Sequence, residues 1–160
     1  PGLQGGPHLN TILAKAVAFD EALQPAFKDY AAQTVANAKE LAEQLNRRGM
    51  HLITGATDNH LLLIDVQKSL GIDGAVAEAA LDAIGLNANK NVIPDDTLPP
   101  FIPSGIRLGT PALTTRGLKT EHMAQVADWI VSAMRNHDDQ QNLARIKNEV
   151  TLFAQQFPLP

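Results

Sequence analysis

The spacing of apolar residues along the chain changes from helical to strand-like and back again. Apolar residues recur every three or four positions over residues 7–24 and over residues 25–48, which predicts two successive helices. Pro25 suits the first turn of the second helix, and Gly49 after two arginines is a typical helix end. We expect this second helix to be long enough to link two lobes of a larger protein. Its apolar stripe comprises Phe27, Tyr30, Ala31, Thr34, Val35, Ala38, Leu41, Ala42 and Leu45.

The period shortens in the middle of the chain. Residues 51–54 predict a short strand, and the continuous apolar run of residues 61–66 predicts a strand covered on both faces. Asp73 is a candidate N-cap for a helix that Gly85 ends. Residues 86–89 are interpreted as a further short strand.

Residues 91–104 contain four prolines and an Asp-Asp pair, which indicates a stiff loop. A strand over residues 106–108 and a helical turn over residues 111–115 follow. Thr120 is predicted to cap a helix, and a last helix is expected to start near Asp138 or Asp139. The inward residues of these two helices are predicted to be Met123, Val126, Ile130 and Met134, then Leu143, Ile146, Val150, Phe153 and Phe157.

These elements predict a small two-layer α/β domain of three or so short strands with helices packed on them. The 160 residues can form a sizeable core, and 44% of them are hydrophobic. The chain begins in a glycine-rich loop without an initiator Met, which we interpret as the start of a fragment of a longer protein.

Charge and composition exclude several classes of function. A net charge of −4 without a basic cluster argues against a general nucleic-acid binder. No apolar run approaches the length of a membrane span, so we expect a soluble cytoplasmic protein. The absence of cysteine excludes disulfides and thiolate metal sites. The five histidines lack metal-ligand spacing and no Gly-x-Ser-x-Gly elbow occurs, so no metal site or Ser-His-Asp triad is predicted.

Arg107 lies between Ile106 and Leu108 in a short run bounded by glycines. Side chains alternate along a strand, so the two apolar neighbours should face the core while Arg107 faces the other way. A guanidinium offers paired donors that match a carboxylate. Arg107 is therefore a candidate clamp for an amino-acid carboxylate, although an exposed or structurally paired arginine is the alternative.

Two weaker signals accompany it. Gln4-Gly5-Gly6-Pro7 before a helix resembles an anion site, but an ordinary turn is favoured. Lys90 between Asn89 and Asn91 has the form of a Schiff-base lysine, but a solvent-exposed turn lysine is favoured.

Together the segments resemble serine hydroxymethyltransferase. The resemblance covers essentially the whole chain, in the family's order and at near-family spacing. It rests on Gln4-Gly5-Gly6-Pro7, Lys15-Ala16-Val17-Ala18, Thr57-Asp58-Asn59-His60-Leu61, Asn89-Lys90-Asn91, Ser104-Gly105-Ile106-Arg107 through Pro111-Ala112, Thr114-Thr115-Arg116-Gly117 and the closing Phe157-Pro158-Leu159.

The resemblance implies the C-terminal part of an enzyme that uses pyridoxal 5′-phosphate (PLP) and has the aspartate-aminotransferase type I fold. Such an enzyme moves a one-carbon unit between serine and tetrahydrofolate, giving glycine and methylenetetrahydrofolate, and is expected to be a cytoplasmic homodimer. Residues 1–24 would end the large PLP-binding domain. Residues 25–160 would form the C-terminal small domain, with a short, mainly antiparallel sheet packed by helices.

The resemblance also implies site residues. Arg107 falls on the arginine that binds the substrate carboxylate, and Gly6 on the glycine whose N–H reaches the cofactor phosphate across the subunit interface. Asn91 falls on the asparagine near the pterin of folate. The loop that contacts folate corresponds to Pro99, Pro100 and Phe101, and Arg116 matches a family arginine near the site.

The chain departs from the family at several positions. Pro99 replaces a frequent serine, Asn10 a frequent histidine, and the loop of residues 67–74 is one residue longer than in some relatives. The family's PLP lysine, stacking histidine, pyridine-binding aspartate and catalytic glutamate lie upstream, so this chain alone is expected to hold no catalytic residue and to be inactive.

Two alternatives stay open from the sequence. One is another PLP enzyme of the same fold, such as an aminotransferase, which would also keep a carboxylate-binding arginine. The other is a non-catalytic binding or dimerisation module.

Overall fold

The computed structural model describes residues 2–159 and divides the chain into two compact units, the first ending at Ala32 and the second beginning at Gln33. Helix α1 (Leu9–Leu23) belongs to the first unit and confirms the helix predicted over residues 7–24. No described residue of α1 is buried, and large apolar side chains such as those of Leu13 and Phe19 are exposed. Helix α2 (Pro25–Arg47) confirms the second predicted helix.

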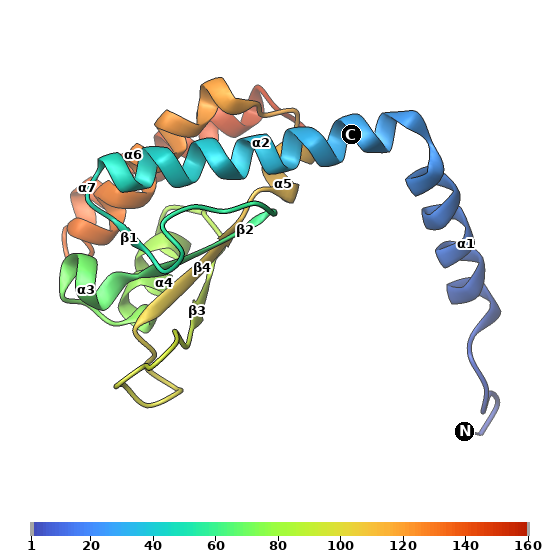
Figure 1. Cartoon of the computed structure of the whole chain (residues 1–160), viewed down its shortest axis with the longest axis horizontal. Coiled ribbons are helices and arrows are strands. Elements are labelled where there is room, and N and C mark those ends of the chain that lie inside the picture. Colours follow the sequence, from blue (N-terminus) through green and yellow to red (C-terminus); the bar gives the residue numbers. More distant parts are fainter. Residues whose placement is uncertain (1, 160) are drawn as a thin grey trace. The chain divides into compact units, whose positions relative to one another are not determined.

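The second unit contains a four-stranded sheet (Figure 1). Its neighbouring strands are all antiparallel, in the order β1-β2-β4-β3. The predicted short antiparallel sheet is therefore confirmed. The strands are β1 (His51–Leu52), β2 (Leu61–Asp65), β3 (Asn89–Asn91) and β4 (Gly105–Gly109).

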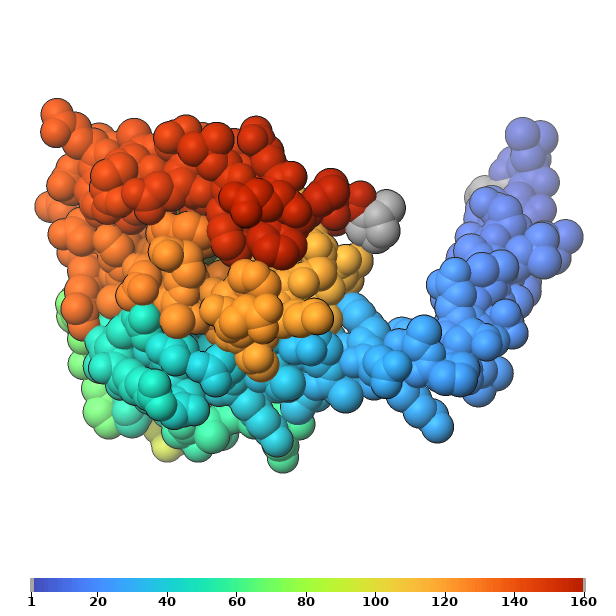
Figure 2. All heavy atoms as spheres, turned by 90° about the horizontal axis from the view of Figure 1, so that it is seen from above, coloured from blue at the N-terminus to red at the C-terminus, as the bar shows by residue number. Residues whose placement is uncertain are grey.

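Helices cover one face of this sheet. They are α4 (Gly74–Ala83), α6 (Met123–Arg135), α7 (Gln140–Gln155) and the second-unit part of α2. Helix α6 lies between α2 and α7 (Figures 1 and 2). Because apolar side chains of strands and helices meet there, this layer holds the core. The core includes Leu41, Leu45, Ile64, Leu81, Ile84, Ile106, Met123, Ile130, Met134 and Ile146.

The expectation that the apolar run of residues 61–66 is a strand covered on both faces is wrong. In β2 the side chains of Leu62 and Ile64 are buried, whereas Leu61 on the other face is 37% exposed. Val66 leaves the strand and begins α3 (Val66–Leu70), a short helix that the sequence did not predict. The helices pack on one face only, so the other face of the sheet has no covering layer within the second unit.

Other boundaries also differ from prediction. Strand β1 ends at Leu52 instead of residue 54, because a turn starts at Ile53, whose N–H makes one more bond to Leu63 O of β2 at 3.0 Å. The strand expected at residues 86–89 begins only at Asn89, where pairing with Arg107 starts; Leu86 and Ala88 instead pack against the core. Lys90, expected in a turn, is therefore a strand residue.

The C-terminal helices follow the predicted pattern with shifted starts. Helix α5 (Pro111–Thr115) confirms the predicted turn. A 3-10 turn (Thr120–His122), which Lys119 precedes, comes before α6, so the N-cap of α6 is His122 and not Thr120. Asp139 caps α7 through its carboxylate, as expected. Phe157 lies beyond α7, and its ring packs 5.0 Å from that of Phe153.

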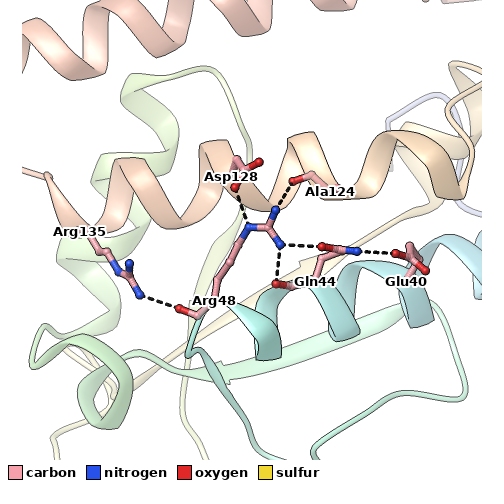
Figure 3. Close-up of polar contacts among 6 residues, drawn as sticks. All are labelled: Glu40, Gln44, Arg48, Ala124, Asp128 and Arg135. Atoms are coloured by element: carbon pink, nitrogen blue, oxygen red, sulfur yellow. Dashed lines mark hydrogen bonds and ion pairs between the residues drawn. The ribbon is translucent and has the colours of Figure 1, made fainter.

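Two polar links fasten α2 inside the second unit. At its end, Arg48 donates from Nε to Asp128 of α6 (2.7 Å) and from Nη1 to Gln44 (Figure 3). Further along α2, the amide of Asn37 donates to Thr114 Oγ1 and to Leu118 O, both at 2.9 Å. Since Asn37 is fully buried, these bonds satisfy a polar group that water cannot reach.

No helix within residues 2–159 is long and apolar enough to cross a membrane.

The substitution Asn37→Ala should destabilise the second unit. It leaves the buried Leu118 carbonyl and Thr114 hydroxyl without their donor, at a cost of about 1–3 kcal/mol in the free energy of unfolding. Urea denaturation followed by circular dichroism measures this cost. The control Asn148→Ala, at an exposed position of α7, should change it by about 0.5 kcal/mol or less. Equal stability of the two variants would contradict this role of Asn37.

Candidate functional site

Arg107 lies in the middle of the uncovered face of the sheet. Ile106 and Leu108 on either side of it are buried and Arg107 is exposed, which confirms the predicted alternation. In register it stands between Leu63 of β2 and Asn89 of β3. Its Nε donates to Asn89 Oδ1 at 3.1 Å. No carboxylate within residues 2–159 pairs with this guanidinium, so its charge is not neutralised by an ion pair there.

Two shallow depressions adjoin Arg107 on the same face. One is lined by residues 87–89 and by the end of β4 together with Leu61. The other is lined by the turn after β1 and by β2, from Thr54 to Leu63. The guanidinium borders both depressions, so a bound anion could approach it from either side.

Asn91 is brought to the same face as Arg107. Asn89 and Asn91 are two residues apart on β3 and therefore point to one side of the sheet. Asn91 stands opposite Gly105, and its amide donates to Val92 O at 2.6 Å. Both asparagines are partly exposed, so their amide groups can also reach a polar ligand.

The loop between β3 and β4 carries the other predicted contacts. Pro99, Pro100 and Phe101 are all exposed, and Phe101 is 72% exposed. Asp96 in the same loop accepts four hydrogen bonds from loop residues. Those from the Ser104 side chain and backbone contribute most to holding the pKa of Asp96 well below its usual range.

Lys90 is engaged at the edge of the sheet. Its Nζ lies 2.9 Å from Glu78 Oε2 on α4, and its backbone N–H donates to Glu78 Oε1 at 3.1 Å. These hydrogen bonds from Lys90 lower the pKa of Glu78. Lys90 therefore joins β3 to α4 by an ion pair and is not available as a free amine.

Gly6 belongs to the first unit. It is exposed, and its carbonyl accepts a hydrogen bond from Gln4 Nε2 at 3.2 Å. Helix α1 begins soon afterwards, and its N-cap residue His8 makes no side-chain capping bond. Thr11 and Ile12 donate their N–H groups to His8 O, so the first-turn N–H groups that could face an anion near Gly6 are those of Leu9 and Asn10.

Two polar residues of this region were not assigned a role from the sequence. Asn89 holds the Arg107 side chain, and Asp96 organises the loop. The pairing of β3 with β4 would have revealed Asn89. No sequence pattern indicated the role of Asp96, because its hydrogen-bond partner Ser104 lies eight residues away in the chain.

A separate hollow lies on the helical side of the sheet. It is an apolar cavity of about 300 Å³ that contains Leu108, Trp129 and Arg116 among its lining residues, and none of the predicted substrate, folate or cofactor contacts. Arg116 donates to Ala154 O of α7 at 2.8 Å, so it fastens the end of α5 to α7. Within residues 2–159, no group of three or more His, Asp or Glu side chains is placed to hold a metal.

The family model and the similar proteins that match this chain all belong to the same family. Residues 1–130 match the sequence model described as serine hydroxymethyltransferase. Over 159 residues the chain is 57% identical to the serine hydroxymethyltransferase of Acidobacterium capsulatum and 52% identical to that of Koribacter versatilis. Each alignment covers 99% of this chain, which spans 37% of the length of either relative. The comparisons favour this family over an aminotransferase.

Gly105→Ala should disturb the strand that carries Arg107. An added Cβ would lie 2.5 Å from Ile93 Cγ2 and 2.6 Å from Asn91 O, so β3 and β4 would have to move apart. We expect a loss of about 1–3 kcal/mol in the free energy of unfolding, measured by urea denaturation.

The control Gly109→Ala lies in the same strand, where the nearest atom would be 3.3 Å away at the tip of Leu61. It should change the free energy of unfolding by about 0.5 kcal/mol or less. A Gly105→Ala protein as stable as this control would show that β3 does not approach β4 so closely.

Proposed function

Because the chain belongs to the serine hydroxymethyltransferase family, we propose that it is the C-terminal part of an enzyme that interconverts serine and tetrahydrofolate with glycine and 5,10-methylenetetrahydrofolate. The observation that carries the proposal is Arg107, an exposed guanidinium that has no carboxylate partner among the described residues and stands on a strand whose neighbouring side chains are buried. The resemblance to the family implies that Arg107 corresponds to the arginine that binds the substrate carboxylate.

Arg107 would bind the carboxylate of the amino-acid substrate. Its Nε is engaged by Asn89, which fixes the plane of the guanidinium, and its Nη groups remain for two parallel hydrogen bonds to the carboxylate. Anchoring the carboxylate in this way sets the orientation of the bonds at the substrate Cα. The strand on which Arg107 stands has a buried side, so its backbone is held by the core beneath.

PLP is the cofactor that we propose for the full-length protein, and when bound it supplies an electron sink for bonds at the substrate Cα. Gly6 fits a phosphate contact because open backbone at Gly5-Gly6 precedes the uncapped start of α1. In the proposed homodimer this contact would be made to the neighbouring subunit's site. The lysine that anchors PLP would come from the part of the family's length that this chain does not span.

The β3–β4 loop would contact folate. Asn91 presents an amide on the same sheet face as Arg107, which suits the polar edge of a pterin. Pro99, Pro100 and Phe101 present exposed apolar surface to flat rings. Serine and folate would thus be held by neighbouring parts of one hairpin, in a cytoplasmic enzyme.

Arg107→Lys in the full-length protein should weaken serine binding by about two orders of magnitude, because an ammonium cannot make the paired bonds. Serine titration of the holoenzyme, followed by the absorbance of the cofactor, measures the dissociation constant. The control Arg145→Lys alters a surface ion pair on α7 and should leave serine affinity unchanged. Equal serine affinity in the Arg107→Lys protein and the wild type would refute the assignment.

The 160-residue chain alone should have no transferase activity. Mixing it with PLP, serine and tetrahydrofolate should yield no glycine, because the catalytic residues are proposed to lie outside it. Glycine release measured by amino-acid analysis tests this, with a full-length family member as positive control. Serine-dependent glycine formation by the chain alone would overturn the proposed division of the site.

A further inference from the structure

The loop between β3 and β4, residues 92–104, is closed at its base. Asn91 and Gly105 pair across the hairpin, and no side chain would fit at Gly105 without displacing Ile93 or Asn91. We call the two ends of the loop its stems, the first at Val92 and Ile93 and the second at Pro103 and Ser104. At the second stem, the Ser104 carbonyl accepts hydrogen bonds from Val66 N (3.0 Å) and Gln67 N (3.2 Å) at the start of α3. Both ends of the loop are therefore fixed by the second unit.

Inside the loop, the carboxylate of Asp96 gathers donors from both sides. Its Oδ2 accepts from Ile93 N (3.2 Å) and Ser104 N (2.9 Å). Its Oδ1 accepts from Leu98 N (3.0 Å) and from the Ser104 hydroxyl (2.6 Å). One side chain thus joins the first stem, the second stem and the residue that leads to the tip.

This carboxylate works as an acceptor only. Within residues 2–159 it makes no ion pair, so its charge is stabilised by neutral donors alone. Hydrogen bonds to the charged form hold the pKa of Asp96 low. The four hydrogen bonds of this carboxylate, which we call the Asp96 clasp, are therefore lost only when the pH falls through that lowered pKa. The four bonds are therefore present throughout the neutral range.

The tip of the loop, Pro99, Pro100 and Phe101, lies beyond the Asp96 clasp and is exposed. A turn closes it through Ile102 N to Pro99 O at 2.9 Å, while Phe101 projects with 72% of its surface exposed. The core does not hold Phe101 in place. The tip is linked to the fixed ends of the loop by the hydrogen bond that Leu98 N, just before Pro99, donates to the Asp96 carboxylate.

We propose that Asp96 is the positioning residue that holds Pro99, Pro100 and Phe101 in one conformation before tetrahydrofolate binds. The proposal rests on the proposed function, since it takes the loop to be the folate contact. A loop ordered in advance loses less conformational entropy on binding, which strengthens folate binding without touching the serine site. The four prolines of the loop act in the same direction.

The test compares Asp96→Asn with Asp95→Asn in the full-length holoenzyme. Asp96→Asn replaces one of the two accepting oxygens by an NH2 group, so one oxygen remains where the carboxylate offers two to the four donors, and the negative charge is lost. Asp95 makes no hydrogen bond or ion pair with the described residues, and its φ of 56° is one that asparagine tolerates well. The two variants make the same chemical change one position apart.

For Asp96→Asn we expect the KM for tetrahydrofolate to rise about tenfold, with the KM for serine unchanged. Asp95→Asn should match the wild type in both. Ser104→Ala, which removes only the hydroxyl donor, should raise the KM for tetrahydrofolate by about threefold. Hydrogen exchange of the peptide over residues 93–104, followed by mass spectrometry, should speed up in Asp96→Asn and not in Asp95→Asn.

The outcomes separate the two proposals. A wild-type holoenzyme that forms no glycine from serine and tetrahydrofolate overturns the proposed function itself. An active wild type whose Asp96→Asn variant keeps the KM for tetrahydrofolate overturns the role of Asp96, whatever the exchange rates show. Parallel rises in the KM for serine and for tetrahydrofolate overturn it too, because they indicate general damage to the fold.

Discussion

The one-sided packing of the four-stranded sheet is the constraint on which the second unit depends. Apolar side chains of β1, β2 and β4 face the helices, so the residues between them must face outward. Arg107 stands on the outward side because Ile106 and Leu108 are needed in the core. The same alternation therefore builds the core and presents the guanidinium.

Buried polar bonds position the elements around that sheet. The Thr110 hydroxyl, next to the end of β4, donates to Thr34 O of α2 at 2.8 Å, and Asn37 joins α2 to the segment after α5. Each is buried, so each bond satisfies a group that would otherwise be costly to leave unpaired. These bonds fix the C-terminal end of β4, while Asp96 and Ser104 fix the loop before its start. The strand that carries Arg107 is thus held at both ends.

Sequence pattern and structure agree best where a residue's role depends on near neighbours. The long helix α2, the capping of α4 by Asp73 and of α7 by Asp139, and the alternation around Arg107 all follow from short-range spacing. Prediction and structure disagree where the outcome depends on which distant elements pack against a segment. The run from Leu61 to Val66 has the composition of a strand buried on both sides, yet the helices pack on one face only.

The amino-acid order alone determined the kind of fold, the helical segments, the outward direction of Arg107 and the resemblance to a family. Only the tertiary structure decided that Asn89 holds Arg107, that Lys90 pairs with Glu78, and that Asp96 gathers donors from both stems of its loop. The reason is physical: backbone spacing fixes which way a side chain points, whereas its partner depends on strand register and loop closure between residues distant in sequence.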